Sequence, residues 1–110
     1  MQDYLLVIKG SDLNTSSPEE MQKALQDYLN WAGNLADQYK DGQRLENQGA
    51  LVYNSGQVIT DGPFLESKEM ISGYVMIQAS SLEEAIGIAK GSPLLEHCHI
   101  EVRPIKQMPD

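Results

Sequence analysis

Hydrophobic positions along the chain follow two different spacings, which predict strands and helices in a definite order. Residues 3–9 form a short apolar run rich in β-branched side chains and closed by Gly10, which predicts a buried strand. Residues 17–20 (SPEE) combine an N-cap serine, a proline suited to the first helical position and a capping-box glutamate. Apolar residues then recur every three or four positions across residues 21–39, which predicts one long helix. We expect Gly42 to end this helix.

The middle of the chain predicts a hairpin followed by a longer strand. Residues 50–53 and 57–60 are short apolar runs, and the Asn-Ser-Gly sequence at 54–56 between them favours a turn with a positive φ. A tight-turn composition follows at residues 61–64. Residues 69–79 then alternate two sets of apolar side chains, which is typical of a strand with two useful faces.

The last third of the chain predicts a second helix and a final strand. Residues 81–84 (SLEE) form another capping box and begin an amphipathic helix, which Gly91 and Pro93 end. Residues 97–105 alternate apolar and polar side chains, which indicates a strand.

The predicted order is therefore strand, helix, hairpin, strand, helix, strand, within a single domain at residues 1–110. This is the α+β ferredoxin-like arrangement, a split β-α-β unit with an inserted β-hairpin. Two amphipathic helices cover only one face of an antiparallel sheet, so the other face stays bare.

Alternation along the strands predicts which side chains lie on each sheet face. The set expected to face the helices is Leu5, Val7, Val75, Ile77, Ile100 and Val102. The set expected on the bare face is Tyr4, Leu6, Ile8, Tyr74, Met76, Gln78, His99, Glu101 and Arg103. Half of the second set is apolar, and soluble monomers rarely expose such a patch. We therefore expect a homodimer in which two such faces enclose a small-molecule cleft.

The composition and charge of the chain argue against several classes of function. The chain of 110 residues has 16 acidic and 8 basic residues and a net charge of −8, which argues against binding nucleic acid or anionic membranes. No apolar run is long enough to span a bilayer, and the first residues lack the basic start of a signal peptide. Cys98 is the single cysteine, which fits a reducing compartment. These features predict a cytoplasmic protein.

A set of motifs resembles one known family. The run DGPFLESKE at residues 61–69 is similar to the DGPF signature of the YCII-related (DGPF-motif) family, and EVRPI at residues 101–105 is similar to that family's ending. The resemblance implies a dimeric α+β barrel built from ferredoxin-like units, with an active site in its cleft. Some bacterial members are encoded near, or fused to, alternative sigma factors. One branch resembles muconolactone-isomerase-like enzymes and has an early His–Asp pair, whereas the first histidine here is His97.

Asp61 and His99 are the candidate catalytic residues. Asp61 opens a turn, so its carboxylate either accepts backbone N–H groups as in an Asx-turn or acts as a general base at the cleft. Histidine is the side chain type best suited to proton transfer near neutral pH, which makes His99 a candidate. A purely structural role is the commoner one for each residue type.

The candidate ligand-binding residues are mostly charged. Arg103 either pairs with Glu101 or binds a carboxylate or phosphate of a ligand through its planar fork. Tyr74 is expected to stack on a ligand or to donate a hydrogen bond to it. Lys68 follows the signature turn, where a solvent-exposed ion pair is the commoner role.

No cofactor or metal is expected. His97 and His99 share a strand face, but no third His or Cys completes a metal site. Cys98 faces the helices and is predicted to be a small core residue. Dinucleotide, Walker and CxxC motifs are absent from the sequence.

Two functional hypotheses remain open at this point. The first is a cofactor-independent enzyme that uses acid–base chemistry on a small molecule. The second is a non-catalytic ligand-sensing or interaction module linked to transcription regulation through sigma factors.

Overall fold

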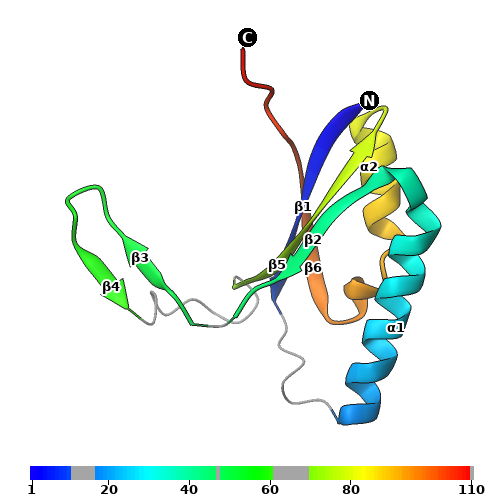
Figure 1. Ribbon diagram of the computed structural model, residues 1–110, viewed down its shortest axis with the longest axis horizontal. Helices are drawn as coiled ribbons and strands as arrows, with labels where there is room; N and C mark the ends of the chain where they lie inside the picture. Colours follow the sequence, from blue (N-terminus) through cyan, green and yellow to red (C-terminus); the bar gives the residue numbers. More distant parts are fainter. Residues whose placement is uncertain (11–16, 47, 61–69, 110) are drawn as a thin grey trace.

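The computed structural model describes residues 1–10, 17–46, 48–60 and 70–109. Its centre is a four-stranded antiparallel sheet with the strand order β2-β5-β1-β6. The strands of this sheet are β1 (Gln2–Gly10), β2 (Tyr39–Arg44), β5 (Ile71–Ala79) and β6 (Cys98–Pro104). Helices α1 (Pro18–Leu35) and α2 (Leu82–Lys90) lie on the same face of the sheet (Figure 1). The predicted α+β, ferredoxin-like arrangement is confirmed.

Both predicted helix starts are confirmed by their capping contacts. The Ser17 hydroxyl accepts a hydrogen bond from the backbone N–H of Glu20 at 3.2 Å, and Ser81 accepts one from Glu84 at 3.1 Å. Each serine thereby satisfies one of the free N–H groups in the first turn of its helix. A short 3-10 helix, η4 (Pro93–Glu96), follows α2 and leads into β6.

The predicted hairpin is also confirmed. It comprises β3 (Ala50–Val52) and β4 (Val58–Thr60), and the turn between them places Gly56 at a φ of 89°. The hairpin extends away from the four-stranded sheet (Figure 1). The turn predicted at residues 61–64 lies outside the described residues.

The end of the first helix was predicted wrongly. Helix α1 ends at Leu35, and a 3-10 turn, η2 (Ala36–Gln38), leads directly into β2. The chain reverses at Ala36, which has a positive φ of 52°. Gly42 therefore lies inside a strand and caps no helix. The prediction missed β2 because its sequence, YKDGQR, is almost wholly polar, as suits a strand at the edge of the described sheet, next to β5.

The predicted faces of β5 and β6 are correct, but those of β1 are reversed. Tyr4, Leu6 and Ile8 are buried under the helices, so Leu5 and Val7 lie on the bare face. Residues 4–8 are all apolar, so β1 has no alternation of its own to set its faces. Its neighbours set them instead, through cross-strand pairs such as Leu6 with Val75 and Leu6 with Val102.

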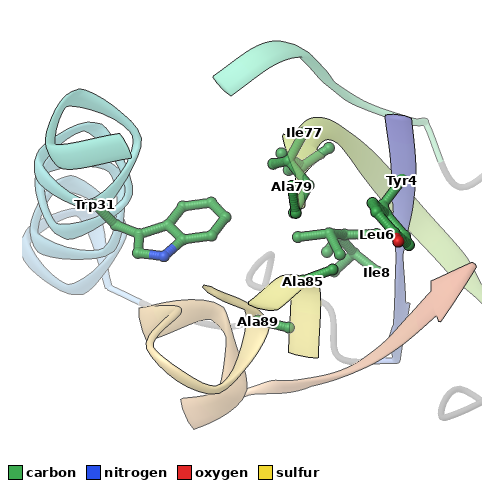
Figure 2. Packing of buried hydrophobic residues seen from close by; sticks show 9 residues of the cluster. Tyr4, Leu6, Ile8, Trp31, Ile77, Ala79, Ala85 and Ala89 are labelled. Carbon is green, nitrogen blue, oxygen red and sulfur yellow. The ribbon is translucent and has the colours of Figure 1, made fainter. Parts of the chain in front are cut away.

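The hydrophobic core lies between the sheet and the two helices. Leu6 and Ile77 are fully buried at its centre, and the Trp31 indole reaches from α1 towards them (Figure 2). Its N–H donates a hydrogen bond to the carbonyl oxygen of Ile88 at 3.3 Å, which ties α1 to α2. Neither helix in the described part of the chain is long and apolar enough to cross a membrane.

Candidate functional site: a cavity walled by two tyrosines

A cavity of about 510 Å³ opens between α1, β2 and the start of β5, on the helix-covered side of the sheet. Its volume falls within the usual range for small-molecule sites, about 300–1,000 Å³. Much of its wall is apolar and includes Ile8, Met21, Leu25 and Val75. A cavity with this lining favours a ligand that is largely apolar.

Two tyrosines supply the main polar feature of the wall. The hydroxyl oxygens of Tyr28 on α1 and Tyr39 on β2 lie 2.6 Å apart, and either hydroxyl can donate the hydrogen bond. The rings meet edge to face with centroids 6.4 Å apart. Two hydroxyls carry two protons, and their mutual bond uses one of them. The second proton is available to a ligand oxygen in the cavity.

Tyr28 stays un-ionised at neutral pH. Burial raises the pKa of Tyr28 far above its ordinary value, and the hydrogen bond to Tyr39 raises it further. The neutral Tyr28 phenol acts as a hydrogen-bond donor and not as a general base near pH 7.

The backbone of β2 explains how the two hydroxyls meet. The register of β2 against β5 shifts between Tyr39 and Asp41, so that Tyr39 and Gly42 lie on the same sheet face. The Tyr39 ring then lies over Gly42. A Cβ atom at Gly42 would overlap the Tyr39 hydroxyl and would lie 2.6 Å from the Tyr28 hydroxyl. The missing side chain at Gly42 therefore makes room for the pair.

Cys98 and Ser72 contribute a second pair of polar side chains to the cavity lining. Cys98 is half-buried and packs against the core, as predicted. Burial raises the pKa of its thiol, while a hydrogen bond with Ser72 opposes the shift. The thiol is therefore protonated at neutral pH, which is unfavourable for a nucleophile.

Arg44 and Glu46 are the charged residues in the described lining of this cavity. Both side chains are exposed, and they lie at the end of β2 and just beyond it. No ion pair joins them to each other within the part of the chain that the structure describes.

Three of the predicted site residues lie on the opposite, bare face of the sheet. Glu101 pairs there with Lys9 at 2.7 Å and lies 3.7 Å from Arg103. Lys9 lowers the pKa of the Glu101 carboxyl through a hydrogen bond and through its charge. His99 is exposed and lies opposite Lys9 in the β1–β6 register. The ion-pair role predicted for Glu101 and Arg103 is thus present in the structure.

Tyr74 also lies on the bare face, at the β2 side, and it is the one predicted ligand-binding residue among those described that contributes to the cavity lining. Its hydroxyl donates a hydrogen bond to Asp41 at 2.9 Å, and the other oxygen of Asp41 accepts the Gly42 N–H at 2.8 Å. The hydrogen bond to Asp41 raises the pKa of Tyr74. Tyr74 therefore fixes the edge strand β2, whose Tyr39 forms part of the cavity wall on the other face. Asp61 and Lys68 lie outside the described residues.

Tyr28, Tyr39 and Arg44 are not among the site residues that the sequence predicts. Both tyrosines fit the apolar stripe of the long helix predicted at residues 21–39. In the structure Tyr39 is instead the first residue of strand β2. One signal was available: a tyrosine on a buried stripe brings a hydroxyl that needs a partner.

Metal ligands do not cluster in the part of the chain that the structure describes, where no group of three or more His, Cys, Asp or Glu residues could hold an ion. His97 is exposed at the end of the 3-10 helix that precedes β6, 3.9 Å from Glu96.

Comparison with known families matches residues 3–109 to the YCII-related domain. The chain belongs to this family. Among solved structures, this YCII-related chain is similar to 5-chloro-2-hydroxyhydroquinone dehydrochlorinase (TftG) from Burkholderia phenoliruptrix AC1100, in complex with 2,5-dihydroxybenzoquinone. The TM-score is 0.59 at 16% identity, over 96% of this chain and 95% of the other. At that identity the likeness establishes the fold. A search of curated proteins finds no match.

Proposed function

We propose that this YCII-related domain is a cytoplasmic homodimer that binds a small ring compound bearing hydroxyl or keto oxygens. The binding site is the cavity walled by Tyr28 and Tyr39. The observation that carries this proposal is the 2.6 Å phenol pair, which presents a spare O–H proton at the edge of a largely apolar cavity. Apolar walls favour the ring, and the hydroxyl pair orients its oxygen.

The structural neighbour supports the same ligand class. TftG is named as an enzyme and is described in complex with a six-membered ring that carries four oxygens. The cavity here has the volume for a ring of that size with substituents.

Removal of both hydroxyls tests the proposal. Calorimetry with 2,5-dihydroxybenzoquinone compares the wild type with the double variant Tyr28→Phe, Tyr39→Phe. We expect the double variant to bind about tenfold more weakly, which corresponds to the loss of one good hydrogen bond. Each single variant keeps one hydroxyl with a free proton, so we expect a smaller loss.

Two controls make this result interpretable. Tyr53→Phe removes an exposed hydroxyl from the hairpin, outside the cavity lining, and should leave binding unchanged. Circular dichroism shows whether each variant keeps its fold. Unaltered binding in a folded double variant would contradict the proposal.

Catalysis on the bound ring is a second part of the proposal. The proposed general base is Asp61. The predicted acid, His99, lies on the bare sheet face and does not reach a ring bound in the tyrosine cavity on the other side of the sheet, so it has no part in this proposal. A general base must lie within hydrogen-bond reach of the proton that it removes. Nuclear magnetic resonance of the incubated ligand measures turnover directly. We expect Asp61→Asn to retain binding and to lose turnover, whereas binding without any conversion would favour the ligand-sensing alternative linked to sigma factors.

The bare face supports the homodimer and offers the competing ligand site. Its centre carries Leu5, Val7 and Met76, and Tyr74, Glu101, His99 and Arg103 surround that centre. Two such faces packed together would remove the apolar centre from water. Sedimentation equilibrium should give the mass of a dimer. Val7→Glu should yield a monomer, while Gln26→Glu on the exposed side of α1 should leave the dimer intact.

A further inference from the structure

We propose that the ligand of the tyrosine cavity carries an acidic group that binds Arg44, so that the ligand class is a hydroxylated aromatic carboxylate. This inference rests on the proposed function of the cavity and adds the chemistry of the ligand's second end.

The position of Arg44 relative to the tyrosine pair sets the geometry. Gly42 lies directly beneath the two hydroxyls, and Arg44 follows two residues later on the same face of β2. Two residues of a strand span about 7 Å. The cavity therefore presents a phenol pair near one point of β2 and a guanidinium further along. A benzene ring with a hydroxyl at one end and a carboxylate at the other matches this arrangement, with the hydroxyl at the phenol pair and the carboxylate at the guanidinium.

The charge of Arg44 is available to a ligand. Lys9, Lys23 and Arg103 each have a carboxylate within 4.0 Å, whereas no such partner of Arg44 occurs in the described ranges of the chain. Lys40, Lys90 and Lys106 likewise have no carboxylate within 4.0 Å in those ranges, so Arg44 differs from them by its place in the cavity lining. A guanidinium binds a carboxylate through two parallel N–H donors, which is a directional and specific contact.

Glu46 allows a test of whether the ligand carries a negative charge. It lines the same cavity and carries the opposite charge. If a ligand carboxylate binds near Arg44, Glu46 repels it, and removal of the Glu46 charge should strengthen binding. A neutral ligand should respond little to either residue.

The experiment uses two ligands that differ only in charge, 4-hydroxybenzoate and 4-hydroxybenzamide. Calorimetry measures both affinities for the wild type, Arg44→Gln, Arg44→Lys and Glu46→Gln. In the wild type we expect the carboxylate to bind about tenfold more tightly than the amide, a difference typical of one charged hydrogen-bonded contact.

The variants should change this ratio in opposite directions. Arg44→Gln should bring it to about one, Arg44→Lys should give an intermediate ratio because it keeps the charge without the fork, and Glu46→Gln should raise it about twofold to fivefold. The control Lys40→Gln removes an exposed charge from β2 outside the cavity lining and should leave the ratio unchanged.

The possible failures are distinguishable. If the amide binds as tightly as the carboxylate and both affinities depend on Tyr28 and Tyr39, the proposed function stands and the acidic-ligand inference is overturned. A ratio that Arg44→Gln leaves unchanged also overturns the inference. If neither compound binds at millimolar concentration, the inference is overturned, and the calorimetry with 2,5-dihydroxybenzoquinone decides separately whether the proposed function stands.

Discussion

Replacement of Gly42 by alanine is the sharpest perturbation of the tyrosine cavity. An added Cβ would overlap the Tyr39 hydroxyl, would lie 2.6 Å from the Tyr28 hydroxyl and would lie 3.3 Å from the ring carbon that bears the Tyr39 hydroxyl. Because real Cβ atoms do not approach neighbours so closely, the rings must move apart and the 2.6 Å hydrogen bond must lengthen or break.

The magnitude follows from three opposing effects. Loss of the hydrogen bond costs about 0.5–1.5 kcal/mol, and overpacking costs about 1–3 kcal/mol. Alanine restricts the unfolded chain more than glycine does, which offsets about 0.5–1 kcal/mol of this cost. We therefore expect Gly42→Ala to lower the free energy of unfolding by about 0.5–4 kcal/mol.

Urea unfolding followed by Trp31 fluorescence and circular dichroism measures this change. Protein concentration is held constant, because association shifts apparent stability. The matched control is Gly87→Ala, since Gly87 lies in the interior of α2 with no atom within 4 Å of a built Cβ. Alanine there should raise stability by up to about 1 kcal/mol. Gly42→Ala that is as stable as the wild type would refute the role given to Gly42.

Two further predictions concern the helix cap and the bare sheet face. Ser81→Ala removes the acceptor of the Glu84 N–H and should cost about 1 kcal/mol of stability in the same urea assay, whereas an unchanged midpoint would argue against this cap. Lys9→Met should raise the pKa of Glu101 towards its ordinary value, as measured by side-chain carboxyl NMR. In the wild type the depressed pKa means that the ion pair adds stability above the ordinary carboxyl pKa, and this stability is lost as the pH falls through the depressed value. An unchanged Glu101 titration in Lys9→Met would contradict this assignment.

Local signals in the sequence predicted most of the fold. The serine caps at Ser17 and Ser81, the Asn-Ser-Gly turn before Gln57 and the alternation in β5 and β6 each depend on a few neighbouring residues. The structure confirms all of them because nothing distant opposes these local preferences.

The errors occurred where local signals were absent. Strand β1 is apolar at every position from 4 to 8, so its faces are set by pairing with β5 and β6 and not by its own pattern. Strand β2 is polar, and it forms because its backbone adds to the edge of β5. Its hydrogen bonds come from a partner about 30 residues away in the sequence, which periodicity cannot reveal.

The lack of a local sequence signal also explains why the candidate site in the structure differs from the predicted one. The sequence directed attention to His99, Glu101 and Arg103, whose spacing is visible in one strand. The cavity instead joins Tyr28 on a helix with Tyr39 on an unpredicted strand. Only the tertiary fold brings these two residues together.

A crystal structure of the protein with 4-hydroxybenzoate tests the central claim most directly. The account predicts ring density between α1 and β2, with the ligand hydroxyl within hydrogen-bond distance of Tyr28 or Tyr39 and the carboxylate on Arg44. Ligand density on the bare sheet face beside His99 and Arg103, with the tyrosine cavity empty, would contradict it.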